Sequence, residues 1–464
     1  MRRIASLGLV AAAILSLASL AAEAAEPSGS SVQPAPSGTG TALGGSSSPS
    51  SALARWGAPV DTASSRDGAT LVALADGAAL ATGGYFANGK PSAGTDRYDP
   101  VTNTWTAVAR MPAPGAQQTA TTLRDGSVLF TGGYEGPNSL TGGGTDSAIL
   151  YLPSGKWVSA GHMSVPREGH TALLLADGRV LVLGGYGGSA LTIGEAPPPL
   201  ATAEIFDPTT RSWKQPFSLP EPIEQFTATL LESGKVLLAG GYVANRGSVV
   251  DSWLYDPGTG TWSKAHPLLE SRSSAIATRL ANGKVLVIGG VRLPANATPG
   301  IFSSLTSGEL YDPVSDSWSR LSTAPPIATN GAASAVLLND GRVLLLLRGP
   351  SATPTSPLVA EFYDPTVDRW NAGPSVISAS SAFGIEAVRL STGRVLVMLS
   401  NESVLFDPGG TSALPAAAAP LQQAENPLNS ARTTPYLVVS ALFFLLIVLV
   451  RYARARIASR PGYR

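Results

Sequence analysis

The sequence predicts an all-β protein, and three marks that recur along its 464 residues carry the prediction, the first in all seven units and the other two in most of them. The first mark is a tight turn, usually Asp-Gly, between two short apolar runs. The second is a Gly-Gly pair six residues after the turn glycine. The third is an aromatic residue followed by Asp and Pro, with a Trp six residues after the Asp in most units. Self-similarity at a period of 49 to 58 residues indicates one repeat architecture rather than several unrelated domains.

The turn and the Gly-Gly pair mark the inner half of each unit. Asp-Gly and its Asn, Ser and Thr variants favour the positive φ angles of a two-residue hairpin turn. The turns stand at 76–77, 125–126, 177–178, 233–234, 282–283, 340–341 and 392–393. Their flanking runs are apolar throughout, which is typical of strands buried on both faces. Gly-Gly permits close approach of backbones in the first five units and is replaced by Leu347-Arg348 and Leu399-Ser400 in the last two.

The third mark places the outer half of each unit. Asp-Pro opens a tight turn, and the Trp after it is a large apolar anchor for the outer strand. These anchors are Trp105, Trp157, Trp213, Trp262, Trp318 and Trp370. Each unit is therefore a four-stranded antiparallel sheet, which cannot bury both of its faces alone. Radial stacking of such sheets predicts a β-propeller over residues 53–410.

The two ends of the repeat region predict how the ring closes. The seventh unit ends at Phe406-Asp407-Pro408, and no Trp follows it in the chain. Trp56, in contrast, precedes the first unit without a unit of its own. We therefore expect seven blades, with the N-terminal strand around Trp56 completing the last one.

The order Gly-Gly, Tyr-Asp and Trp at this period resembles the kelch repeat family, over residues 53 to about 410. The resemblance implies a kelch-type propeller. It implies no single activity, because kelch propellers include both enzymes and binding modules.

The two termini predict export and a membrane anchor. Residues 1–24 show the charged start, apolar run and small residues of a secretory signal peptide. Residues 25–52 are rich in Ser, Gly and Pro and are predicted to be a disordered leader. After a linker at 411–433, residues 434–450 are predicted to form a transmembrane helix, followed by a basic tail at 451–464. The positive-inside rule then places the tail in the cytoplasm and the propeller outside it, in the periplasm or at the cell surface of a bacterial-type cell.

Composition excludes several classes of site. The chain has no Cys and only three His, which excludes disulfides, thiolate metal sites and a copper-radical site with a Cys–Tyr cross-link. Lys and Arg balance Asp and Glu at 32 each, so no basic face indicates nucleic-acid binding. We expect no cofactor and no metal, and we expect a monomer.

Long connections indicate where ligands bind. The four strands of a unit are called A to D in chain order. The A–B and C–D turns are short, whereas the B–C and D–A connections on the other face are long, and function usually lies in such loops. Alignment on the turn places candidate ligand-binding residues at or near the start of strand A. They are Arg66, Asp67, Gln118, Arg167, Glu168, His170, Glu224 and Arg272.

Three of these candidates suggest an anionic ligand. Arg66, Arg167 and Arg272 share one register, ten residues before the turn, in units one, three and five. Guanidinium groups converging on the channel mouth would suit a carboxylate, a sulfate or an acidic peptide. The alternative is that these side chains fix neighbouring loops.

The sequence therefore predicts a recognition or adhesion module for a protein or carbohydrate ligand. The alternative is a carbohydrate-active enzyme of the kelch type, similar to a sugar mutarotase or epimerase, at the same mouth. In that alternative Glu168, His170 and one Arg would supply acid, base and anion clamp. We favour the binding module, because no Gly-rich phosphate loop, paired-carboxylate cleft or metal spacing is visible in the chain.

Overall fold

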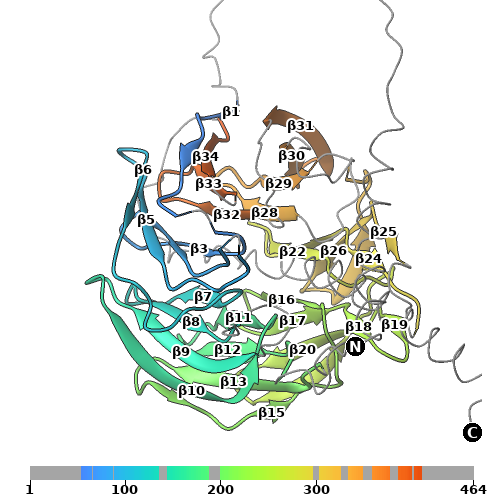
Figure 1. The fold of residues 1–464 in the computed structure, drawn as a ribbon. Coiled ribbons are helices and arrows are strands. Elements are labelled where there is room, and N and C mark those ends of the chain that lie inside the picture. Colours follow the sequence, from blue (N-terminus) through green and yellow to red (C-terminus); the bar gives the residue numbers. More distant parts are fainter. Residues whose placement is uncertain are drawn as a thin grey trace, which may run out of the picture. The chain divides into compact units, whose positions relative to one another are not determined.

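The computed structural model describes residues 54–409, except 65, 87, 135–143, 188–198, 296–301, 326–332, 349–357, 377–384 and 400–401. The described residues form strands β1 to β34 and no helix. Seven four-stranded antiparallel sheets follow one another around a ring (Figure 1), so the predicted seven-bladed propeller is confirmed.

The first three blades are built from consecutive segments of chain. Blade 1 has β3 (Thr70–Ala73), β4 (Ala79–Thr82), β5 (Thr95–Asp99) and β6 (Thr104–Ala107). Blade 2 has β7 (Thr119–Thr122), β8 (Val128–Thr131), β9 (Thr145–Tyr151) and β10 (Trp157–Arg167). Blade 3 has β11 (Thr171–Leu174), β12 (Val180–Leu183), β13 (Thr202–Asp207) and β14 (Ser212–Trp213), and β15 (Phe217–Ser218) also pairs with β13.

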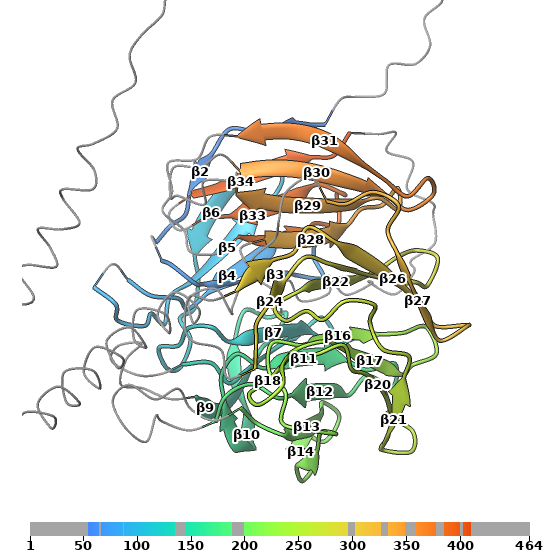
Figure 2. The same cartoon turned by 90° about the vertical axis from the view of Figure 1, so that its right-hand side faces the viewer.

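The remaining blades repeat the same order. Blade 4 has β16 (Thr227–Leu230), β17 (Val236–Ala239), β20 (Ser252–Asp256) and β21 (Thr261–Ala265). Blade 5 has β22 (Ile276–Arg279), β23 (Val285–Ile288), β26 (Gly308–Asp312) and β27 (Ser317–Arg320). Blade 6 has β28 (Ala333–Leu337), β29 (Val343–Arg348), β30 (Leu358–Asp364) and β31 (Arg369–Val376). In the side view these four strands of blade 6 lie one beside another in order (Figure 2).

Blade 7 closes the ring with the N-terminal strand, as predicted. It has β32 (Glu386–Arg389), β33 (Val395–Met398), β34 (Glu402–Asp407) and, as strand D, β1 (Arg55–Trp56). Trp56 lies opposite Phe406 in the register, and β2 (Val60–Asp61) also pairs with β34. The Trp56 indole donates a hydrogen bond to the Pro374 carbonyl of blade 6 at 2.8 Å. Strand A of blade 7, β32, then contacts strand A of blade 1, β3.

The A–B turn differs in one detail from the expected two-residue hairpin. In blade 3 the Leu175 N–H donates to the Arg179 carbonyl, and the Gly178 N–H donates to the Leu175 carbonyl. Three residues therefore lie between the closing pair, and Gly178 alone has a positive φ, 91°. This is a type I turn followed by a left-handed glycine, so the Asp contributes a side-chain cap rather than a positive φ.

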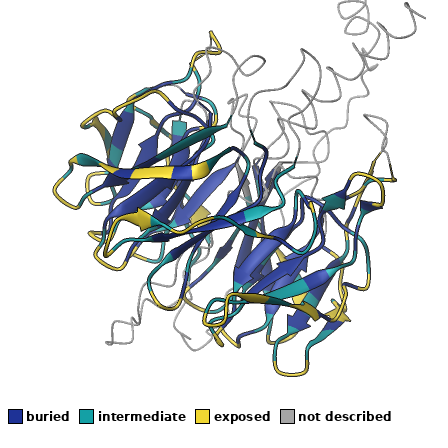
Figure 3. Cartoon of the chain, turned by 90° about the horizontal axis from the view of Figure 1, so that it is seen from below, coloured by how far each residue is buried: buried dark blue, intermediate teal, exposed yellow. Residues whose placement is uncertain are grey.

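The hydrophobic core lies between the blades. The residues of β11 to β13 in blade 3, for example, share one apolar cluster with those of β16, β17 and β20 in blade 4. The Trp of each D strand packs on the aromatic residue of its C strand, as Trp105 does on Tyr98 with ring centroids 5.2 Å apart. Figure 3 shows the strands buried and the exposed residues gathered at turns and edges. Burial between sheets explains why the B strands, such as β12 and β23, are apolar on both faces.

Two short hairpins extend the fold on one face. The B–C connection of blade 4 forms β18 (Tyr242–Val243) and β19 (Gly247–Ser248). That of blade 5 forms β24 (Val291–Arg292) and β25 (Ser303–Ser304).

The predicted terminal segments lie outside the described residues. They are the signal peptide at 1–24, the leader at 25–52, the linker at 411–433, the transmembrane helix at 434–450 and the tail at 451–464. In the part of the chain that the structure describes, no helix has the length and apolar character to cross a membrane.

Candidate functional site

The B–C and D–A connections meet on one face of the ring, which we call the B–C/D–A face. In blade 1 the Asp67 N–H donates to the Tyr85 carbonyl at 3.0 Å, and the Tyr85 N–H donates to the Asp67 carbonyl at 2.7 Å. Equivalent backbone bridges join Glu168 to Tyr186, Glu224 to Tyr242 and Ser273 to Val291. The residues one place after the arginine register therefore pair with the B–C connection just before strand A begins. They are Asp67, Glu168, Glu224 and Ser273.

Arg167 is held inside blade 3 rather than pointing to a ligand. Its Nη1 donates to the carbonyl oxygens of Gly184, at 2.9 Å, and Thr202, at 3.2 Å. Its Nη2 lies 2.8 Å from Oε1 of Glu204, the third residue of β13. The side chain is 0% exposed, and burial lowers the pKa of Arg167 despite the opposing effect of Glu204.

Arg272 and Arg66 repeat this arrangement in blades 5 and 1. Arg272 donates to the Gly289 and Ser307 carbonyls at 2.8 and 3.2 Å and to Glu309 Oε1 at 2.9 Å. Arg66 donates to the Gly83 carbonyl at 3.0 Å, to the Gly94 carbonyl and to Asp96 Oδ2. We call each Arg–carboxylate pair with its two carbonyl contacts a clasp.

The clasps correct the prediction of a convergent anion site. Arg66, Arg167 and Arg272 are 4, 0 and 1% exposed, and each guanidinium is neutralised by a carboxylate of its own blade. A buried charge is tolerated only with such a partner, so these groups cannot turn outward to a ligand without leaving a carboxylate stranded. The alternative that the sequence left open, in which the arginines fix neighbouring loops, is the one the structure shows.

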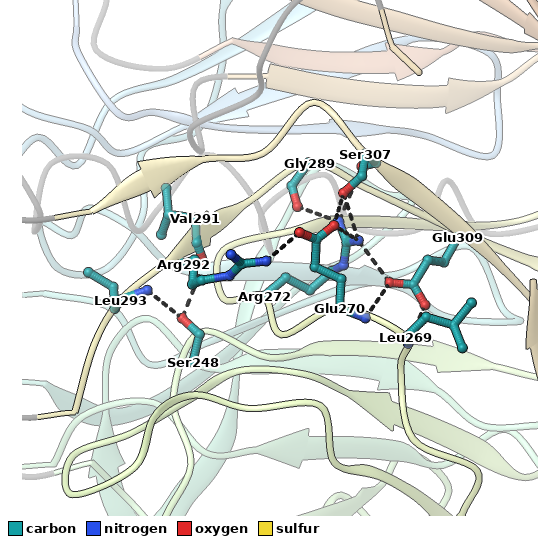
Figure 4. A network of polar contacts seen from close by, with 10 residues as sticks. All are labelled: Ser248, Leu269, Glu270, Arg272, Gly289, Val291, Arg292, Leu293, Ser307 and Glu309. Carbon is teal, nitrogen blue, oxygen red and sulfur yellow. Dashed lines mark hydrogen bonds and ion pairs between the residues drawn. The ribbon is translucent and has the colours of Figure 1, made fainter. Parts of the chain in front are cut away.

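The carboxylates of the clasps also bind the preceding connection. Glu309 accepts hydrogen bonds from the backbone N–H groups of Leu269 and Glu270, at 2.7 and 3.1 Å (Figure 4). Glu204 accepts the corresponding bonds from Ser164 and Val165, at 2.6 and 3.1 Å. In blades 3 and 5 the clasp therefore fixes the path by which the chain leaves one blade and enters the next.

His170 and Gln118 lie in the seams between blades. The Nε2 atom of His170 is 3.0 Å from the hydroxyl oxygens of both Thr119 and Thr131, which belong to blade 2. The backbone carbonyl of Gln118 accepts a hydrogen bond from the Thr70 hydroxyl of blade 1 at 3.0 Å. The His170 ring and the Gln118 carbonyl therefore each link two adjacent blades. Both side chains are buried.

The acidic candidates divide by exposure. Glu168 is buried, whereas Asp67 and Glu224 are partly exposed at the rim. Burial raises the pKa of Glu224 to about 7, although a hydrogen bond from the Tyr186 side chain of blade 3 acts in the opposite direction. Of the eight predicted site residues, Asp67 and Glu224 are the two that are partly exposed rather than buried.

Sequence reasoning missed the tyrosines of this rim. A Tyr follows the Gly-Gly pair in each of the first four blades, at Tyr85, Tyr134, Tyr186 and Tyr242. Each of them forms the backbone bridge to its D–A connection. The ring centroids of Tyr85 and Tyr134, in adjacent blades, are 6.1 Å apart. The signal was visible, because the Gly-Gly-Tyr triplet recurs four times in register.

The two hairpins of blades 4 and 5 are joined to each other. The Ser248 N–H donates to the Leu293 carbonyl, and the Leu293 N–H donates to the Ser248 hydroxyl, both at 2.9 Å (Figure 4). Arg292 forms an ion pair with Glu270, which also accepts a hydrogen bond from Ser307. The D–A and B–C connections of blade 5 are thereby tied into one polar network.

A second charged group lies on the blade 4 connection. Arg246 forms ion pairs with Glu221 at 2.6 Å and with Asp251 at 2.9 Å. Lys264 also reaches Asp251, at 3.3 Å. Among the described residues, no three His, Asp or Glu side chains come together in a group that could hold a metal ion.

Comparisons with known proteins agree with this architecture. The family model of the kelch motif matches residues 71–112 and 170–216. Kelch-like protein 23 of Mus musculus and that of Homo sapiens are each 28% identical over 167 residues, which is 36% of this chain and 27% of those proteins. The match thus spans about a quarter of the curated relatives. A solved structure of YjhT superposes with a TM-score of 0.50 and 17% identity over 68% of this chain and 99% of that chain, which supports the fold alone.

Proposed function

Because this chain is a kelch-repeat protein, we propose that it is a recognition module that binds a protein partner through the B–C/D–A face. One observation carries the proposal. The described connections on this face form hydrogen-bonded hairpins that carry charged side chains, whereas the A–B turns of the opposite face are tight. Variable connections on a rigid scaffold are the usual place of recognition.

The proposed surface differs in charge from the one that the sequence suggested. The three arginines that favoured an anionic ligand are enclosed in clasps. Exposed charges on the face instead come from the blade 4 and blade 5 connections, where Arg246 and Arg292 lie beside acidic groups. A mixed, hydrogen-bonding surface of this kind is typical of the rim of a protein–protein interface.

The enzyme alternative gains no support from the described residues. It assigned acid and base roles to Glu168 and His170 and an anion clamp to an arginine. Glu168 and His170 are 2 and 3% exposed, and Arg167 is bonded to Glu204. A general base must come within hydrogen-bond reach of a substrate proton, and these groups are enclosed by protein.

Capture experiments with surface variants test the proposed face. Partners cross-linked to the full-length protein in its own cells would be compared between wild type and an Arg246→Ala, Arg292→Ala double variant. We expect the double variant to lose its main partner. Lys235→Ala with Lys284→Ala, which changes the A–B turns of the opposite face, is the matched control and should keep it. Loss with the control variant only would overturn the proposal.

We further propose that the propeller is exported and held at a membrane by residues 434–450. This proposal rests on the sequence of the two ends alone. A chain ending at residue 433 should appear in the soluble exported fraction with its propeller folded. Recovery of that shortened chain in the membrane fraction, with residues 1–24 removed, would contradict the anchor.

A further inference from the structure

The described chain enters and leaves the propeller at one point of the ring. β1 begins at Arg55, which lies opposite Asp407, the last residue of β34 (Figure 1). The two side chains also form an ion pair, with Nη2 and Oδ2 3.7 Å apart. Because β34 is strand C of blade 7, it ends on the face of the A–B and C–D turns, which we call the A–B/C–D face. In blade 7 the two chain segments therefore take the place that a C–D turn has in the other blades.

The C–D turns on either side of this point carry exposed valines. Val101 in blade 1, Val314 in blade 5 and Val367 in blade 6 are 90, 95 and 58% exposed. Blades 5, 6, 7 and 1 follow one another around the ring, because their A strands β22, β28, β32 and β3 contact each other in that order. Among the described residues, no other large apolar side chain is exposed on the A–B/C–D face. The exposed apolar groups of this face therefore lie in the arc from which the chain leaves.

The geometry of the C–D turn does not require a valine. In each turn the Asp that ends strand C accepts a hydrogen bond from the backbone N–H two residues further on. The donor is Val101 in blade 1, at 2.8 Å, and Val314 in blade 5, at 2.9 Å. Thr209 in blade 3 and Gly258 in blade 4 make the same bond at 2.9 Å. Polar or small residues thus serve the turn equally well, so the valines need an explanation outside the fold.

We infer that the A–B/C–D face of blades 5, 6, 7 and 1 contacts the lipid surface of the membrane, through its three exposed valines. The inference rests on the proposed membrane anchor at residues 434–450. Residues 410–433 separate Gly409 from that span, so blade 7 cannot move more than about 80 Å from the bilayer. A contact held at such a high local concentration needs little affinity of its own. The B–C/D–A face then points away from the membrane, toward a partner that arrives from outside.

The charges of the same arc indicate that the contact is apolar. In each of its four blades an acidic and a basic side chain of this face are paired with each other. The pairs are Asp76 with Arg97, Asp312 with Lys284, Asp340 with Arg342 and Asp407 with Arg55. Paired charges leave no basic patch that would draw the face to anionic lipids. A zwitterionic phospholipid surface is therefore sufficient, and salt should not release the contact.

Four equivalent residues of the C–D turns provide matched positions for a fluorescent reporter. Thr102, Thr210, Thr259 and Ser315 each stand three residues after the Asp, are exposed and share a hydrogen bond with the hydroxyl two residues further on. Thr102 and Ser315 belong to the arc, in blades 1 and 5, whereas the other two belong to blades 3 and 4. Because the chain has no Cys, a single Cys at each position can be labelled with an NBD dye. Asn88→Cys, in the B–C connection of blade 1, reports on the opposite face.

Quenching by lipid measures which positions lie at the membrane. The labelled full-length proteins are incorporated into phosphatidylcholine nanodiscs that contain a lipid with a spin label in its headgroup. We expect Thr102→Cys and Ser315→Cys to show blue-shifted emission and stronger quenching than the other three proteins, unchanged by added NaCl. Equal quenching at all five positions, or the strongest at Asn88→Cys, would overturn the inference and leave the anchor intact. A full-length protein that does not enter the discs would contradict the anchor, and the inference with it.

A triple variant tests the valines themselves. Val101→Asp, Val314→Asp and Val367→Asp together should lower the quenching of the Ser315→Cys reporter to the level of the blade 3 reporter. The melting temperature should stay the same, because all three side chains are exposed and the backbone makes the turn's hydrogen bond. Thr209→Asp, at the same turn position in blade 3, is the control and should leave the quenching unchanged. Quenching that survives the triple variant would show that the valines do not make the contact.

Discussion

Arg167 and Glu204 form an ion pair in which both side chains are fully buried, with Nη2 and Oε1 2.8 Å apart. The pair joins the entrance of blade 3 to its third strand, and Glu204 adds two hydrogen bonds from the last strand of blade 2. The clasp therefore lies where the chain leaves blade 2 and enters blade 3.

We expect Arg167→Ala to destabilise the protein by about 3–5 kcal/mol, because it leaves Glu204 buried without its cation. This reverses the expectation from sequence alone, in which the position tolerated Gly, Ile, Asn or Ala in other blades. Urea unfolding monitored by tryptophan fluorescence measures the change. The Arg167→Met, Glu204→Met double variant should lose much less than the single variant. Arg369→Ala, at an exposed arginine, is the control, and equal small losses in all three variants would contradict the clasp.

Glu224 should make stability fall as pH rises. Its pKa is about 7 in the folded protein, above the ordinary 4.5, so the folded state holds a proton that the unfolded chain releases. The contribution is therefore fully present below pH 4.5 and lost as pH rises to about 7. We expect Glu224→Gln to be more stable than the wild type at pH 8 by about 1–2 kcal/mol, after discounting for partial exposure.

The two proteins should not differ in this way at pH 4. Unfolding curves at both pH values measure the difference. Identical curves at pH 8 would show that Glu224 is ionised without cost.

The N-terminal strand should contribute more to stability than its two residues suggest. We expect a chain starting at residue 58 to be much less stable than one starting at residue 51, because only the former loses β1 and exposes the edge of β34. Trp56→Ala should cost about 3–5 kcal/mol through loss of its packing on Phe406, with ring centroids 4.7 Å apart. Arg55→Ala is the control, since that side chain is 77% exposed. Similar melting temperatures for the two truncated chains would argue against closure by this strand.

His170 should be structural rather than catalytic. We expect His170→Phe to cost about 1–3 kcal/mol, because the ring nitrogen beside the hydroxyls of Thr119 and Thr131 is lost from a buried seam. Phenylalanine is a fair test, since Phe226 stands at the same register in blade 4. Adding Thr131→Val should recover part of the loss. Thermal unfolding measures all three proteins, and a stability unchanged by His170→Phe would dismiss the link.

Much of the fold could be predicted because its determinants are local. The left-handed turn glycine, Gly178 in blade 3, and the Trp of each D strand act within a few residues of their positions, so their spacing alone indicates blades. The closure by Trp56 followed from counting, since a ring of equal units has no place for a spare strand. Only the turn length was wrong, because Asp-Gly is compatible with both two- and three-residue loops.

By itself, the sequence determined the number of blades, their strand order and the face on which the chain varies. The tertiary structure alone decided what the conspicuous polar residues do. Arg66 finds its carboxylate 30 residues further along the chain, and Arg167 and Arg272 find theirs 37 residues further, across B–C connections of different lengths. No local spacing marks such a pair. A long cation at a loop looks the same in sequence whether it faces a ligand or is buried against its own blade, and only the partner's position in space distinguishes the two.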